Sequence, residues 1–118
     1  MGQWFISLKE SYWNGPSQKT DNFWFRNGFI QFFDKRIVVL RQQNFINHKQ
    51  KYEVDFVLFS NNTDWTIQQV QQQFNYKQLV FDASNNWKKI RQWTKECQEL
   101  QIEFYDVSKS GALTIQLN

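Results

Sequence analysis

Apolar residues in the first third of the chain fall into short runs typical of β-strands, at residues 4–6, 23–25, 29–33 and 36–40. Asp34 and Lys35 separate the last two of these runs. Two turn-compatible residues between two strand-like runs predict a β-hairpin. The polar, amide-rich residues 41–52 that follow predict a loop, which contains His48. The pattern therefore predicts a β-rich N-terminal part.

The rest of the chain alternates strand-like and helix-like segments. Residues 54–59 are almost continuously apolar, which predicts a strand buried on both faces. Residues 60–64 then supply residue types that cap helices, and Ile67, Val70 and Phe74 follow at helical spacing. The same unit repeats as a short strand at 79–81, a capping loop at 82–86 and a second helix. The apolar stripe predicted for that helix consists of Trp87, Ile90, Trp93, Cys97 and Leu100.

The order of these elements predicts the fold class. Residues 102–105 predict a third strand, residues 108–111 a turn, and the alternation of Leu113, Ile115 and Leu117 a partly exposed final strand. Strands that alternate with helices imply right-handed parallel crossovers. We therefore predict an α/β fold, in which a β-rich N-terminal hairpin region precedes a β-α-β-α-β-β unit. A chain of 118 residues fits a single domain, with a β-rich part at 1–52 and the βαβαββ part at 53–118.

The composition excludes several classes of site. The single cysteine rules out an internal disulfide bond, and the single histidine rules out a multi-histidine zinc site. No apolar run approaches the roughly 18 residues that a membrane span needs. The formal net charge is +3, but residues 1–51 carry +5 and residues 52–118 carry −2. This asymmetry fits a basic face toward phosphates or anionic lipid, although on charge alone a solubilising surface is the simpler interpretation.

Polar side chains follow each predicted parallel strand. In open α/β sheets, ligands bind beyond the carboxyl ends of the strands, and helix N-termini at that edge favour phosphate groups. The same residue types are what helix caps require, so a structural role is the simpler interpretation. The candidate polar site consists of Ser60, Asn61, Asn62, Asp82, Ser84, Asn85 and Asp106.

No set of residues specifies a catalytic centre. Asp82 and Asp106 become neighbours if their strands pair, but two carboxylates without a histidine, a metal ligand or an activated nucleophile define no reaction. His48 is predicted to be a surface residue and Cys97 a core thiol. The four glycines are scattered, so the sequence contains no glycine-rich phosphate loop. We therefore expect no catalytic residue, no metal site and no cofactor.

Basic residues next to aromatic ones suggest a contact with nucleic acid. Residues 23–26 and 87–91 combine cations with aromatic rings, as single-strand binders do to neutralise phosphates and stack bases. The helical stripe assigns Trp87 to the core, however, and alternate aromatic residues at 23–33 are expected to face inward. The candidate DNA contacts are Arg26, Lys35, Arg36, Lys88, Lys89 and Arg91.

Several segments follow one another in a characteristic order over residues 35–118. They are the runs at 35–40, 54–62 and 79–85, then Trp93 with Cys97, and finally the ending Tyr105-Asp106-Val107-Ser108-Lys109-Ser110-Gly111-Ala112-Leu113-Thr114-Ile115. This ordered set resembles the C-terminal tail of ComEC-type competence proteins, particularly the shortened Bacteroidetes kind, whereas residues 1–34 match only loosely. In that family the tail follows a polytopic membrane channel that imports single-stranded DNA. The tail is similar to the last half of a metallo-β-lactamase-like domain, so the resemblance implies that fold.

The chain departs from this family where the metal-binding relatives hold histidine. In those relatives the strand corresponding to residues 54–59 ends in a His-His-Gly-Ser element, and the next strand–helix loop carries Gly-His-Pro. The corresponding places here hold Ser60-Asn61-Asn62 and Ser84-Asn85-Asn86. The family's His-x-His-x-Asp-His element belongs to a preceding half that this sequence does not contain. Amide and hydroxyl oxygens alone are poor ligands for Zn²⁺ or Mn²⁺, so the resemblance implies a nuclease-like scaffold without its metal centre.

The resemblance and the replaced histidines lead to one functional hypothesis. We expect a non-catalytic accessory domain of a ComEC-like DNA-uptake protein, which guides DNA or docks onto a partner. The expected partners are single-stranded DNA, the membrane channel of the same parent protein and a second copy bound through exposed aromatics; no small-molecule substrate is expected. The chain is expected to be a fragment of a larger inner-membrane protein, with this domain on the periplasmic side.

The alternative hypothesis is a protein-interaction module unrelated to DNA. It rests on the aromatic load of 12 Phe, 6 Trp and 4 Tyr. A half-domain without its companion sheet is expected to expose apolar area, and exposed apolar patches commonly mark interfaces.

Overall fold

The computed structural model describes residues 4–8, 23–26, 29–32, 35–41 and 51–117, and for residues 4–8, 23–26, 32 and 114–117 it describes the backbone alone. His48 and Asp34 therefore lie outside the described residues, and so does most of the loop predicted at 41–52.

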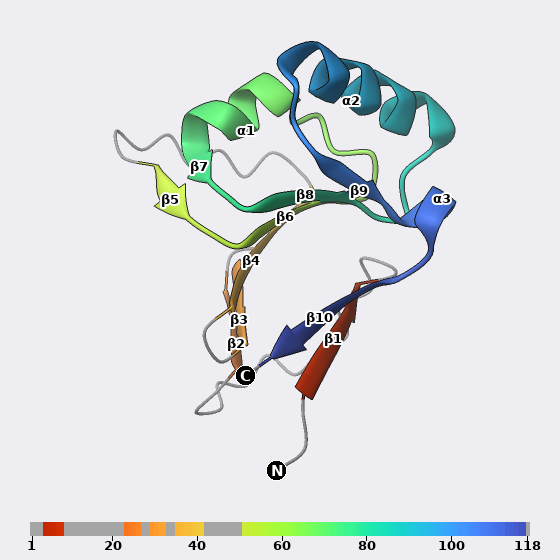
Figure 1. Ribbon diagram of the computed structural model, residues 1–118. Coiled ribbons are helices and arrows are strands. Elements are labelled where there is room, and N and C mark those ends of the chain that lie inside the picture. Colours follow the sequence, from red (N-terminus) through yellow and green to blue (C-terminus); the bar gives the residue numbers. More distant parts are fainter. Residues whose placement is uncertain (1–3, 9–22, 27–28, 33–34, 42–50, 118) are drawn as a thin grey trace.

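A six-stranded mixed sheet forms the centre of the fold (Figure 1). In spatial order its strands are β2 (Phe23–Arg26), β3 (Phe29–Phe32), β4 (Lys35–Leu40), β6 (Phe56–Phe59), β8 (Gln78–Phe81) and β9 (Phe104–Asp106). The first three strands are antiparallel neighbours, and β3 with β4 forms the predicted hairpin. The other three strands run parallel to β4, as the alternation of strands and helices predicts. The predicted α/β fold class is confirmed.

Further elements lie on both faces of this sheet. Helices α1 (Ile67–Gln73) and α2 (Trp87–Leu100) cover one face, and an antiparallel pair lies on the other side (Figure 1). This pair joins the two ends of the chain, β1 (Trp4–Leu8) and β10 (Leu113–Leu117). The sequence pattern does not reveal the pairing, because alternation marks a strand without naming its neighbour. The smaller elements are the parallel pair β5 (Tyr52–Glu53) with β7 (Phe74–Asn75), and the one-turn helix α3 (Val107–Ser110) in place of the predicted turn.

The parallel strands build two apolar cores because their side chains alternate between faces. Val57 and Phe59 belong to the core shared with α1 and α2, whereas Leu58 between them belongs to the core on the opposite face. None of the three is more than 3 % exposed. The prediction of a strand buried on both faces is therefore confirmed.

Trp93 lies at the centre of the larger core. Its side chain is buried, and its ring centroid lies 4.9 Å from that of Phe59 and 5.3 Å from that of Phe81. Its indole N–H donates to the backbone oxygen of Trp65 at 3.0 Å. Cys97, one turn later on α2, is also buried, and this burial raises the pKa of its thiol to about 12. The predicted core thiol is present and stays protonated at neutral pH.

The two ends of the predicted stripe on α2 are exposed instead of buried. Trp87 is 64 % exposed and Leu100 is 52 % exposed. With 3.6 residues per turn, the two three-residue steps from Trp87 to Trp93 rotate the position by about 120° around the helix. Trp87 is therefore turned away from the sheet, and Leu100 is the last residue of the helix. The prediction that both residues belong to the core is wrong.

The first helix begins later than the capping cluster predicts. Its N-cap is Thr66, whose hydroxyl accepts the Gln69 N–H at 3.1 Å while the Gln69 side chain accepts the Thr66 N–H at 3.0 Å. Phe74 is buried as predicted but belongs to β7 and not to the helix. Because Thr66 caps α1, the polar residues 60–64 serve a different purpose.

Candidate functional site at the carboxyl edge of the sheet

The parallel strands end at one edge of the sheet, which we call the carboxyl edge. The strand register aligns the last residues of β4, β6 and β8, so that Arg41, Ser60 and Asp82 come next. Two backbone hydrogen bonds extend this alignment: the Ser60 N–H donates to Leu40 O at 3.0 Å, and the Asp82 N–H donates to Phe59 O at 3.1 Å. The loops after β6 and β8 are thereby held side by side.

The loop after β6 is a tight turn that favours asparagine. The backbone oxygen of Ser60 accepts the Thr63 N–H at 3.1 Å. The two residues between them, Asn61 and Asn62, have φ angles of 52° and 54°. Asparagine adopts this left-handed conformation more readily than most residues other than glycine. The turn alone therefore explains why amides stand at these positions.

Reciprocal hydrogen bonds join this turn to the loop after β8. The Asn61 N–H donates to Ser84 Oγ at 2.8 Å, and the Asn62 N–H donates to Asn85 Oδ1 at 2.8 Å. In the other direction, the Asn86 N–H donates to Asn62 Oδ1 at 2.7 Å. Each loop thus satisfies backbone donors of the other. We call residues 60–62 and 82–86 together the loop clasp.

Asn85 is the buried centre of the loop clasp. Its amide nitrogen donates to Phe59 O at 2.7 Å and to Asp82 O at 3.1 Å, while its Oδ1 accepts the Asn62 N–H. The residue is only 8 % exposed, so water is a poor substitute for these partners. One side chain therefore ties the end of β6, the turn after it and the loop after β8 together.

Asp82 is a fully buried carboxyl group within the loop clasp. Its Oδ1 accepts the Ser84 N–H at 2.9 Å and also the Ser84 hydroxyl. Its Oδ2 is buried and accepts no hydrogen bond of normal geometry from the described residues. Burial raises the pKa of Asp82, although the hydrogen bonds from Ser84, the Ser60 hydroxyl and the positive charge of Arg41 act in the opposite direction.

The raised pKa of Asp82 predicts a pH-dependent stability that the Asp82→Asn substitution removes. Because the pKa of Asp82 is higher in the folded state than in the unfolded state, the folded state binds the proton more tightly. The stability that this proton gives at low pH is lost as the pH rises through the folded-state pKa. Relative to Asp82→Asn, the wild-type protein should therefore lose stability between about pH 4 and about pH 7. Urea unfolding of both proteins at both pH values measures this change. An identical stability difference at the two pH values would contradict the prediction.

Asp106 lies at the same edge but in a cap of its own. Its carboxylate Oδ1 accepts the N–H of Ser108 at 3.0 Å and the hydroxyl of Ser108 at 2.6 Å, which caps α3. Within the described part of the chain, no hydrogen bond joins Asp106 to the loop clasp. The structure therefore brings six of the seven candidate polar residues together and leaves Asp106 apart from them.

The candidate DNA contacts fall into a strand group and a helix group. Lys35 and Arg36 begin β4, and Arg26 ends β2 with its side chain outside the part that the structure describes. The helix group lies on α2, where Lys88 and Arg91 are exposed. The third member, Lys89, is half-buried, and its Nζ lies 3.5 Å from Oδ1 of Asp64.

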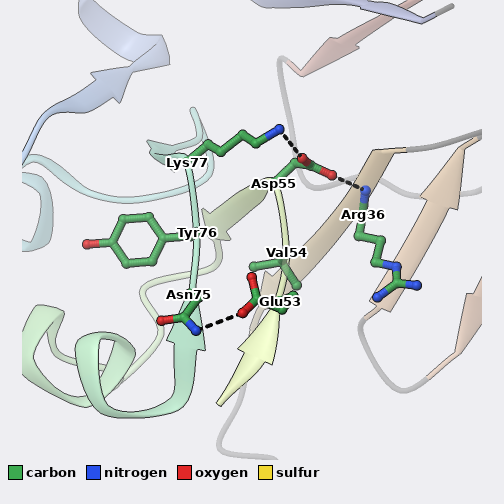
Figure 2. Close-up of a pocket in the computed structure, with 7 residues that line it drawn as sticks. All are labelled: Arg36, Glu53, Val54, Asp55, Asn75, Tyr76 and Lys77. Atoms are coloured by element: carbon green, nitrogen blue, oxygen red, sulfur yellow. Dashed lines mark hydrogen bonds and ion pairs between the residues drawn. The ribbon is translucent and has the colours of Figure 1, made fainter.

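A pocket lies at the opposite edge of the sheet, where the parallel strands begin (Figure 2). Its acidic groups fasten neighbouring segments: Asp55 accepts the Arg36 N–H at 2.8 Å and its Oδ1 lies 3.1 Å from Lys77 Nζ, and Glu53 accepts the Asn75 amide at 2.8 Å. Burial would raise the pKa of Asp55, but the hydrogen bond and the Lys77 charge outweigh it, so this pKa lies below its ordinary value. These polar groups therefore support the strands.

The chain matches one known protein family over almost its whole length. The model of the ComEC C-terminal domain family matches residues 3–117. The chain belongs to this family. Membership associates it with the competence proteins of DNA uptake. No curated protein and no solved structure matches the chain, so the Bacteroidetes kind and the metallo-β-lactamase-like fold stay predictions from the resemblance.

Within the described ranges, no three side chains of His, Cys, Asp or Glu lie close enough to hold a metal ion together. The helices in those ranges are too short or too polar to cross a bilayer.

The sequence does not predict the positions of two residues in this ComEC C-terminal domain: Arg41 is not among the candidate site residues, and Trp87 is assigned to the core. Arg41 directly follows β4, and only the parallel pairing of β4 with β6 places it beside the loop clasp. Its Nε is buried without a hydrogen-bond partner among the described residues. Trp87 lies about 120° around the helix from Trp93, and this angle predicts a place on the outer face. Its three-residue spacing from Ile90 does not by itself reveal this.

Proposed function

We propose that this chain is a non-catalytic accessory domain of a ComEC-like DNA-uptake membrane protein, in which it guides DNA or docks a partner. The observation that carries the proposal is the loop clasp. At the edge where α/β proteins bind ligands, the polar groups of two loops are hydrogen-bonded to each other. By the resemblance, these loops take the places of the histidine elements of the metal-binding relatives.

The donor atoms of the loop clasp also argue against a hydrolytic metal. The side-chain oxygens of Asn62 and Asn85 each accept a backbone N–H of the other loop. A cation would have to displace these hydrogen bonds, and Zn²⁺ and Mn²⁺ bind neutral amide oxygens poorly. The Asp82 carboxyl, whose pKa is raised, is the one acidic group in residues 60–62 and 82–86.

The proposal extends to the setting of the domain. The parent would lie in the inner membrane with this domain on its periplasmic side, next to the channel of the same parent protein. Single-stranded DNA is the proposed cargo, and a second copy of the chain is a further partner through exposed aromatic residues. No small-molecule substrate or cofactor is part of the proposal.

A cleavage assay tests the absence of catalysis. End-labelled single-stranded and duplex DNA is incubated with the protein and either Mn²⁺ or Zn²⁺, and the products are separated on a denaturing gel. We expect both substrates to stay intact. Stoichiometric, tight metal binding together with hydrolysis would overturn the proposal. The Asp82→Asn variant serves as the control, because only cleavage that is lost in it depends on the carboxyl group of the loop clasp.

A protein-interaction module unrelated to DNA is the second candidate, favoured by the exposure of Trp87 and Leu100 at the two ends of α2. Binding of a short single strand at about 50 mM and about 200 mM salt separates the two functions. DNA guidance predicts an affinity that falls as the salt concentration rises. A chain that binds no DNA even at the lower salt concentration favours the interaction module.

A further inference from the structure

The outer face of α2 combines an exposed aromatic ring with cations. Trp87 is 64 % exposed, and the Lys88 ammonium group lies 5.8 Å from the centroid of its indole ring. Arg91 and Lys95 are exposed as well. Because positions three and four apart are neighbours on a helix, these four residues form one continuous face about 12 Å long. We call it the α2 face.

The acidic groups near this face leave most of its charge uncompensated. Asp64 lies beside Lys89, which is not part of the α2 face. Glu96 is directed to α1, where its carboxylate accepts the Ile67 N–H at 2.9 Å. Glu99 lies one turn beyond Lys95, at the end of the helix away from Trp87. The end of the face around the indole ring is therefore positively charged.

We propose that the α2 face binds single-stranded nucleic acid, with a base stacked on Trp87 and phosphates contacted by Lys88, Arg91 and Lys95. The proposal rests on the proposed DNA-guiding function and adds the surface of the domain that contacts the strand. A base in a single strand can leave its neighbours and stack on an exposed ring, whereas the bases of a duplex are stacked within the helix. Cations around such a ring neutralise the backbone of the same strand.

A membrane surface fits the α2 face less well than a nucleic acid does. Helices that bind membranes insert a broad apolar face between the lipid headgroups. The apolar face of α2, with Ile90, Trp93 and Cys97, is buried in the protein core, and only one ring belongs to the charged face. An isolated ring among cations matches a stacking platform.

Substitution of Trp87 tests the stacking contact. Fluorescence anisotropy measures the affinity of the full chain for a labelled oligothymidine and for a labelled duplex, at about 50 mM salt. Trp87→Ala should weaken binding of the single strand roughly tenfold and leave duplex binding unchanged, while Trp87→Phe should keep most of the affinity. Leu100→Ala, which removes the other exposed apolar side chain of α2, is the matched control and should bind like the wild type.

The outcomes separate this inference from the function on which it rests. Equal single-strand affinities of Trp87→Ala and the wild type, with binding still sensitive to salt, would overturn the stacking contact and leave DNA guidance standing. Equal losses for single strand and duplex would also overturn it, because stacking predicts a selective loss. A wild-type protein that binds neither DNA would overturn the inference and DNA guidance together. Thermal unfolding of each variant verifies that the fold is intact.

Discussion

Replacing Asn85 with alanine should lower the free energy of unfolding by about 3 kcal/mol. The substitution removes the amide that donates to the backbone oxygens of Phe59 and Asp82, and the oxygen that accepts the Asn62 N–H. The oxygens of Phe59 and Asp82 each keep one backbone N–H, so the loss is that of three hydrogen bonds made by a buried side chain, each worth about 1 kcal/mol. Urea unfolding followed by tryptophan fluorescence measures the loss.

Two further substitutions identify the source of this effect. Asn85→Asp keeps the oxygen that accepts the Asn62 N–H but loses the donor and brings a second carboxylate next to Asp82, so it should be destabilising as well. Asn61→Gly is the matched control: the exposed residue has a φ of 52°, which glycine adopts freely, and it should change stability by less than about 0.5 kcal/mol. If Asn85→Ala is as stable as this control, the loop clasp does not hold the edge together.

Removing three cations of the α2 face should flatten the salt dependence of DNA binding. In the variant Lys88→Gln/Arg91→Gln/Lys95→Gln, we expect the slope of log K against log salt to become shallower by about 2, since each phosphate contact to a single strand contributes about 0.7. At about 50 mM salt this corresponds to an affinity at least roughly tenfold lower than that of the wild type. Anisotropy titrations at several salt concentrations give both quantities.

A single cation elsewhere supplies the comparison. Lys109 is exposed on α3, and Lys109→Gln should leave the slope within the error of the wild type. An unchanged slope in the triple variant would place the DNA contact away from α2. The strand group at the start of β4 would then be the next candidate surface, through Lys35 and Arg36.

Much of the fold follows from the apolar pattern because that pattern records burial. The continuous run at 54–59 marks a strand with both faces covered, and the spacing of Ile67 and Val70 marks a helix with one buried side. The apolar pattern does not predict that β1 pairs with β10, because alternation identifies a strand but not the strand beside it. The pattern also does not predict that Trp87 and Leu100, at the two ends of α2, are exposed.

The sequence predicts for a topological reason that the candidate residues lie at the carboxyl edge, but it does not predict the hydrogen bonds among them. Parallel strands end together, so Ser60 and Asp82 had to be neighbours once their strands paired. The hydrogen bonds between the two loops depend on the positive φ angles of Asn61 and Asn62. Asparagine favours such angles, but its presence in the sequence does not establish them. The charge of Arg41 lies near Asp82 because of the register of β4 against β6, which no motif encodes.

A crystal of the domain soaked with Mn²⁺ and examined by anomalous scattering shows whether the carboxyl edge can hold a catalytic metal. We expect no manganese at this edge and intact hydrogen bonds from the Asn61 and Asn62 N–H groups to Ser84 and Asn85. A manganese ion coordinated by Asp82 and Asp106, with these hydrogen bonds broken, would contradict it.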